Sequence, residues 1–207
     1  MRATASSQLF TACPTCSVAV LALVAFVGCG RPAAGDTSKP GTIDSVVPRE
    51  AALRRFQEKL QRPVGLSGSA ESREQLVRRF ITALEARDTS ALLALSMTVE
   101  EFAFLYYPTN PQSLPPYDVS PDLLWFLIEG NGRKGLMLAL DERGGAPLGY
   151  VGHSCDSEPS REGENTVWGP CVIRRVQAPG DTVSERLFGP IIERGGRYKF
   201  VNLANKL

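Results

Sequence analysis

The one histidine of the chain, His153, is the residue type best suited to acid–base chemistry. It stands in the stretch 152–156 beside Cys155, and an imidazole titrates close to neutral pH, as a general base must. A metal site needs three or four converging ligands, and a cysteine that forms a disulfide offers no thiolate. We therefore expect no metal and no cofactor, and we interpret His153 as a structural residue that is also the one candidate catalytic base.

Motifs of covalent and phosphate chemistry do not occur in the sequence. Neither G-x-S-x-G nor S-x-x-K is present, and the phosphate loop G-x-x-x-x-G-K-[ST] is missing as well. The glycines of residues 130–132 are typical of a turn, and Glu100 and Glu101 have the spacing of a helix cap. The sequence thus favours a binding protein over an enzyme.

Aromatic side chains are concentrated in residues 102–126, on both sides of a proline-rich loop. We expect the phenylalanines among them to be core residues. Tyr and Trp carry a polar tip that needs a partner or water, which favours positions at the rim of a cavity. The candidate ligand-binding residues are therefore Tyr106, Tyr107, Tyr117 and Trp125.

The length and composition predict one globular domain with a short appendage. The chain has 207 residues, of which 43% are hydrophobic and 22% charged, far from the composition of disordered proteins. Arg2 is the one charged side chain before residue 29, so its removal leaves 22 basic and 22 acidic residues. A neutral protein has no general electrostatic attraction for nucleic acid, and we expect no nucleic-acid partner.

The N-terminus has the features of an export signal. Arg2 precedes the apolar stretch 17–28, which is about as long as the hydrophobic region of a signal peptide and too short to span a bilayer. The junction Phe26-Val27-Gly28-Cys29 resembles the lipobox of bacterial lipoproteins, in which a small residue precedes the cysteine that is lipidated and becomes the new N-terminus.

The lipobox resemblance implies a domain plan and a location. Residues 1–28 would be the signal peptide, Cys29 the attachment site of acyl chains such as palmitate, and residues 29–48 a disordered tether rich in Gly, Pro and Ser. The protein would be anchored in the cell envelope. Gly30 in place of Asp implies the outer membrane, with the domain of residues 49–207 facing the periplasm.

The cysteine count predicts one disulfide. Cys13 and Cys16 leave with the signal peptide and Cys29 carries lipid, which leaves Cys155 and Cys171 as a pair in an oxidising compartment. Closing a loop of about 15 residues contributes roughly 3 kcal/mol in the chain-entropy model.

Apolar spacing and capping signals predict helices in the first part of the domain. Ser72, Asp88, Thr98 and Ser120 are N-cap residues in front of apolar helical stripes, and a further helix is expected from about residue 133 until Gly144 ends it. The first helix, which Pro63 ends, carries Leu53, Phe56 and Leu60.

Strand signals follow from Leu148 onward. Runs rich in β-branched and aromatic residues alternate with turn signals, and the four predicted strands are 148–153, 166–176, 182–193 and 197–203. Helices followed by strands predict an α+β fold, in which helices pack on one face of a four-stranded antiparallel meander.

Two stretches resemble the nuclear transport factor-like, or ketosteroid-isomerase-like, family. They are residues 72–96, a helix followed by Ala-x-x-x-x-Asp and a second helix, and the closing 192–201 with Arg-Gly-Gly-Arg-aromatic-x-aromatic. The resemblance implies a cone, in which a bent sheet wraps helices around a cavity.

The functional prediction is an envelope lipoprotein whose domain binds a small apolar ligand or a protein partner. The first alternative is an isomerase- or dehydratase-like enzyme that uses a cone cavity with His153 as its base. The second is a purely structural envelope protein, which needs no cavity.

Replacement of Cys29 by Ser tests the anchor. We expect the acylated N-terminal peptide to disappear from mass spectra and the protein to lose its processing at residue 29, because the acyl chains attach to the thiol. Fractionated cells provide the measurement. The lipoprotein prediction is wrong if the Cys29→Ser variant is processed at the same residue and stays as firmly on the membrane.

Overall fold

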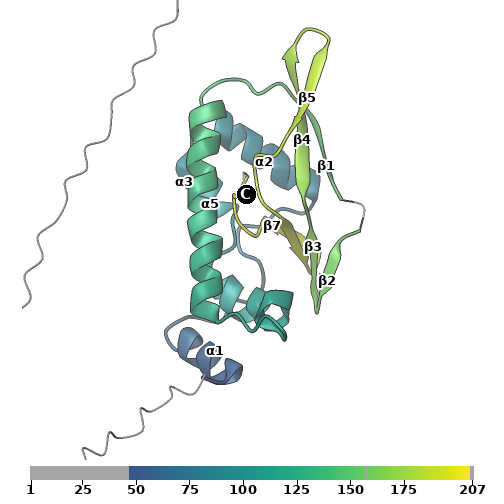
Figure 1. The fold of residues 1–207 in the computed structure, drawn as a ribbon. Helices are drawn as coiled ribbons and strands as arrows, with labels where there is room; N and C mark the ends of the chain where they lie inside the picture. Colours follow the sequence, from purple (N-terminus) through teal and green to yellow (C-terminus); the bar gives the residue numbers. More distant parts are fainter. Residues whose placement is uncertain (1–46, 157, 206–207) are drawn as a thin grey trace, which may run out of the picture. The chain divides into compact units, whose positions relative to one another are not determined.

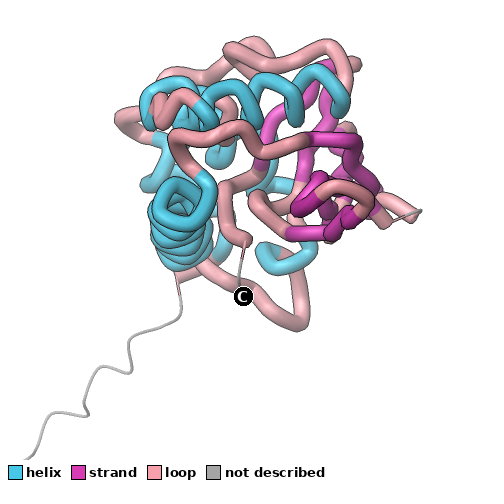
Figure 2. The backbone as a smooth tube through the Cα atoms, turned by 90° about the horizontal axis from the view of Figure 1, so that it is seen from above, coloured by secondary structure: helices cyan, strands magenta, loops and turns pink. Residues whose placement is uncertain are grey.

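The computed structural model describes residues 47–156 and 158–205, all of which belong to one compact unit, Ser45–Leu207. The predicted signal peptide, the lipid site Cys29 and the predicted tether up to residue 46 lie outside the described residues. Within this unit helices gather on one side and strands on the other (Figures 1 and 2). The predicted α+β class is confirmed.

Three of the four N-terminal helices begin at the predicted caps, whereas the first follows Pro48, which makes no side-chain cap. The side chain of Ser72 accepts a hydrogen bond from Gln75 N, that of Asp88 from Ala91 N, and Thr98 forms a full capping box with Glu101. The four helices are α1 (Arg49–Gln57), α2 (Arg73–Glu85), α3 (Thr89–Ala94) and α4 (Val99–Glu101).

The proline-rich region is more regular than predicted. A π-helical turn (Phe102–Tyr106) continues directly from α4 and is followed by two 3-10 turns, Tyr107–Thr109 and Pro111–Ser113. Hydrogen bonds hold these turns together, because Ser113 Oγ donates to the carbonyl oxygens of both Tyr107 and Asn110. Tyr106 is thereby fixed at the end of a wide turn, a geometry that is often found at functional sites.

Helix α5 (Pro121–Arg143) corrects the prediction of two helices separated by a glycine turn. It is continuous through residues 130–132, although glycine costs a helix about 1 kcal/mol relative to alanine. The compensation is close packing of the C-terminal segment against the helix. A Cβ atom at Gly135 would collide with the backbone of Leu203, and one at Gly132 would lie 3.1 Å from Asn202 Cβ.

The strands form two antiparallel sheets, where the sequence predicted one meander. The three-stranded sheet has the order β1 (Tyr150–Cys155), β4 (Cys171–Ala178), β5 (Asp181–Glu185). The four-stranded sheet has the order β2 (Ser160–Glu162), β3 (Asn165–Trp168), β6 (Ile191–Arg194), β7 (Arg197–Phe200). Two predicted strands are each divided between the sheets, at Gly169-Pro170 and at Gly189-Pro190, because proline cannot donate to a ladder.

The four-stranded sheet has apolar residues on both faces. Adjacent residues belong to different core clusters: Ile191 and Phe200 pack with α2 and the second half of α5, whereas Ile192 and Val201 pack with Phe102 and the start of α5. The prediction that helices cover one face only is therefore wrong. Strand periodicity explains the arrangement, since neighbouring side chains point to opposite faces.

The predicted disulfide between Cys155 and Cys171 is present. The two residues face each other in the ladder of β1 and β4. The loop that they close contains β2 and β3, which belong to the other sheet. The bond therefore ties the point where the chain leaves the three-stranded sheet to the point where it returns.

A buried ion pair joins the last strand to the helical part. Lys199 Nζ lies 2.9 Å from Glu101 Oε2, and each side chain is 1% exposed. The Glu101 carboxylate also accepts hydrogen bonds from Ser67 N, Ser67 Oγ and Thr98 N. The capping role predicted for Glu101 is confirmed, but its partner lies 98 residues away and could not be predicted from local spacing.

We expect Lys199→Met to lower the free energy of unfolding by about 3–5 kcal/mol, because Glu101 would remain buried without its partner. The double variant Glu101→Gln, Lys199→Met should lose less of the free energy of unfolding, because no unpaired charge remains buried. Urea unfolding measures both, with Lys134→Met on the exposed face of α5 as the matched control. A Lys199→Met loss no larger than that of the control would contradict this role.

Candidate functional site

Two adjoining cavities lie along helix α5, whose residues line both of them. Together we name them the α5 cleft. The sheet-side cavity, of about 500 Å³, lies between α5 and the turns around Pro170 and Pro190. The helix-side cavity, of about 450 Å³, lies between α5 and α3. Both volumes fall in the range of small-molecule sites, roughly 300–1,000 Å³. The two cavities share the lining residues Ile128, Val201 and Asn202.

The C-terminal segment that follows β7 forms the floor of the cleft. Asn202 holds it in place, because its Nδ2 donates to Ile128 O on α5 and its Oδ1 accepts from Ala204 N. Asn205 Nδ2 donates to Gly135 O farther along the same helix. On its other side, Asn202 O accepts from Gly189 N. Figure 2 shows the segment between the long helix and the strands.

The four predicted aromatic residues have different surroundings. Tyr106 lines the sheet-side cavity and Trp125 the helix-side cavity. Tyr107 is 1% exposed and donates through its hydroxyl to Val119 O, so it is a core residue. Tyr117 is 68% exposed and lines neither cavity. The structure thus places two of the four at the cleft, on different sides of its floor.

The helix-side cavity has an apolar wall around Trp125, and its rim carries the ion pair Glu129–Arg133. Trp125 packs on Phe102, with ring centroids 5.2 Å apart, and the side chains of Leu93 and Met137 are 54% exposed. The hydroxyl of Ser96 is buried and forms no hydrogen bond among the described residues. A buried hydroxyl without a partner is unfavourable, so Ser96 Oγ offers a polar contact to a ligand in this groove.

A buried carboxyl group, that of Glu162, is close enough to Tyr106 to influence its pKa. Glu162 is 7% exposed, and burial raises its pKa although Asn110 Nδ2 and Ser160 Oγ donate to it. Burial, and next the charge of Glu162, raise the pKa of Tyr106. The Tyr106 hydroxyl therefore stays protonated at neutral pH and can act as a hydrogen-bond donor but not as a base.

His153 lies away from the cleft, in a cluster with Glu74 and Tyr150. His153 Nδ1, Glu74 Oε2 and Tyr150 OH are each 3.1 Å from the other two. Tyr150 and His153 share a face of β1 because the strand carries a bulge between Tyr150 and Gly152. The sequence predicted neither partner, since Glu74 comes from helix α2 and a regular strand would point residues 150 and 153 to opposite faces.

The pKa values in this cluster are shifted mainly by burial. Burial lowers the pKa of the His153 imidazole, and the Glu74 carboxylate partly opposes that shift. Burial and then Glu74 raise the pKa of Tyr150 to about 12. A carboxylate that orients a histidine is typical of acid–base sites. However, no Ser, Thr or Cys side chain of residues 47–156 and 158–205 forms a hydrogen bond with His153.

A third cavity, of about 630 Å³, lies between α2 and α3 and is lined by Glu74 and Arg78. His153 is not one of its lining residues. Arg78 Nε lies 2.6 Å from Glu74 Oε1, so the same carboxylate serves both the arginine and the His153 cluster. The cavity therefore does not bring the histidine into a site that encloses a substrate.

In the part of the chain that the structure describes, no three His, Cys, Asp or Glu side chains converge as metal ligands would. No helix there has the length and apolar character needed to cross a bilayer. Comparisons of the chain with protein-family models, with curated proteins and with solved structures gave no match.

We expect acid to destabilise the protein through His153. Its pKa is lowered in the folded state, so the unfolded chain binds more protons once the pH falls below the ordinary value of 6.5. The free energy of unfolding should therefore fall as the pH drops from about 6.5 toward the lower folded-state pKa, and His153→Gln should remove that part of the dependence. An NMR titration that places the folded-state pKa at or above 6.5 would contradict this.

Proposed function

We propose that the protein is a bacterial lipoprotein, anchored through Cys29 in the cell envelope, whose α+β domain binds a small apolar ligand in the α5 cleft. The observation that carries the binding proposal is that two apolar cavities share the floor Val201–Asn202 and that each contains one of the predicted aromatic residues, Tyr106 or Trp125. Side chains with an apolar body and a polar tip suit such a site.

The anchor and its location rest on the sequence alone. The apolar stretch 17–28 and the junction at Gly28-Cys29 support export and lipidation, and Gly30 supports the outer membrane with the domain facing the periplasm. An anchored domain with an apolar cleft would meet lipids, their breakdown products or apolar segments of other envelope proteins. A protein partner would use the same cleft.

The cone arrangement of the nuclear transport factor-like family remains part of this proposal. Its support is the order of the elements, with helices α2 and α3 before the strands and the closing Arg197–Phe200 strand leading into the cleft floor. In such a cone the cavity lies between helix and sheet, as the sheet-side cavity does. The purely structural alternative is disfavoured by the presence of cavities of ligand size.

Catalysis is the second candidate function, and the Glu74–His153 contact is what favours it. The arrangement could orient the imidazole so that its other nitrogen accepts a proton. The separation of His153 from the α5 cleft argues against it, because the base would then act outside the cleft proposed to hold the ligand.

Binding of phenylnaphthylamine, a neutral apolar fluorophore, tests the proposed function. The protein is prepared as the chain from Gly30 onward, which carries no lipid. It therefore needs no detergent, which would compete with the probe for the cleft. We expect Trp125→Ala to weaken binding about tenfold, because truncation of an aromatic anchor removes contact area and admits water. Met137 lines the same cavity and is exposed, so Met137→Gln should weaken binding without disturbing the core.

Tyr117→Ala is the matched control, since Tyr117 is an exposed aromatic residue outside the cleft. We expect this variant and His153→Ala to bind the probe like the parent. The binding proposal fails if folded Trp125→Ala and Met137→Gln retain the parent affinity. A turnover activity that His153→Ala abolishes would establish the enzyme alternative instead.

A further inference from the structure

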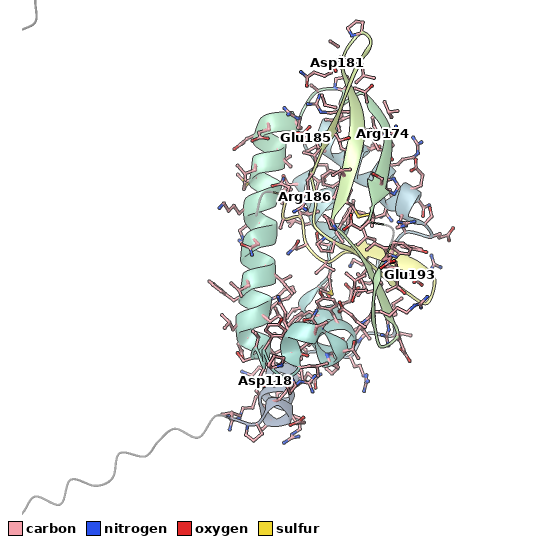
Figure 3. The ribbon with its side chains drawn as sticks, turned by 45° about the vertical axis from the view of Figure 1, so that its right-hand side comes forward. Asp118, Arg174, Asp181, Glu185, Arg186 and Glu193 are labelled. Carbon is pink, nitrogen blue, oxygen red and sulfur yellow. A yellow bond between two sulfur atoms is a disulfide. The ribbon has the colours of Figure 1, made fainter. Side chains whose placement is uncertain are left out.

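Arg186 places a positive charge in the sheet-side cavity. It follows the last residue of β5, Glu185, and is only partly exposed. Arg186 is a lining residue of the cavity between α5 and the turn at Pro190. Figure 3 shows Arg186 in the space between the long helix and the strands.

The guanidinium of Arg186 has no hydrogen bond or ion pair with any residue of 47–156 or 158–205. The adjacent carboxylate cannot serve it, because Glu185 already binds two other arginines. Arg143 NH2 lies 2.7 Å from Glu185 Oε1, and Arg175 Nε lies 2.7 Å from Glu185 Oε2. The guanidinium is therefore free to form charge-assisted hydrogen bonds with an incoming anion.

The walls of the cavity suit an apolar chain. Leu124, Leu127, Ile128, Phe188 and Val201 supply apolar surface, and the amide of Asn131 is a further polar group. None of the described residues that line the cavity is Asp or Glu, so its charge is that of Arg186. One cation in an apolar cavity is the pattern that recognises an amphipathic anion.

We propose that the sheet-side cavity binds an acyl ligand with a single anionic head group, and that Arg186 pairs with the head group while the chain lies along α5. The planar guanidinium matches the two oxygens of a carboxylate or of a phosphate monoester, so both head groups share this chemistry. The inference rests on the proposed function and names the ligand class that the cleft accepts.

Photo-crosslinking in envelope membranes that contain the full-length protein tests this inference. One probe is a fatty acid with a diazirine in its chain, and the other is the matching alcohol. We expect the fatty acid to label peptides of α5 and of residues 186–190. Arg186→Gln should reduce that labelling about tenfold and leave labelling by the alcohol unchanged, because only the acid uses the guanidinium.

Arg174→Gln is the matched control: Arg174 lies on the neighbouring strand β4, is exposed and lines no part of this cavity. We expect it to leave labelling by both probes unchanged. Equal reduction by Arg174→Gln would show general attraction by basic residues and overturn the inference. Leu127→Trp, which puts a larger side chain at a lining position, should reduce labelling by both probes.

Competitors identify the head group. Decanoate or decyl phosphate should displace the fatty-acid probe, and decanol should not; whichever anion competes better is the preferred head group. Equal labelling by acid and alcohol that Arg186→Gln leaves unchanged would refute the role of Arg186 while the apolar cleft stands. If neither probe labels α5 and Leu127→Trp changes nothing, the proposed binding function fails as well.

Discussion

The carboxylate of Glu101 and the ammonium of Lys199 meet inside the domain, where both side chains are almost fully buried. Glu101 stands at the end of α4, directly before the turn that carries Tyr106, and Lys199 stands two residues before Val201. The pair therefore fixes a wall and the floor of the α5 cleft relative to each other. Because the same carboxylate also holds Ser67 and Thr98, a change at Glu101 would release three segments together.

The domain separates two kinds of chemistry. The α5 cleft, which we propose as the ligand site, combines apolar walls with polar groups, among them Ser96 on one side of the floor and Arg186 on the other. The His153 cluster joins ionisable groups that satisfy one another. Binding of an apolar ligand involves no proton transfer, so the proposed function does not need His153 as a base. The packing of β1 against α2 explains the position of the histidine.

Local signals in the sequence predicted the parts of the fold that local interactions determine. Ser72, Asp88 and Thr98 cap the expected helices because each cap is a contact within a few residues. The Cys155–Cys171 pair followed from counting cysteines. The continuity of α5 could not be predicted in the same way, because it depends on the close approach of Leu203, which is distant in sequence from Gly135.

Long-range partners account for the other differences. Lys199 alternates with apolar residues in β7, and its burial could be predicted only with knowledge of Glu101. The prolines at 170 and 190 are visible in the sequence, but the change of sheet at each one is a tertiary property. Tyr106 and Tyr107 are neighbours with the same side chain, but Tyr106 lines the cleft and Tyr107 lies in the core.

Amide hydrogen exchange with and without bound phenylnaphthylamine tests most directly whether the α5 cleft is the binding site. We expect slower exchange in α5 and in residues 201–204, where the ligand covers the helix and the floor, and unchanged exchange in β1 around His153. Protection confined to β1 and α2, with none in α5 or the floor, would contradict binding in the α5 cleft.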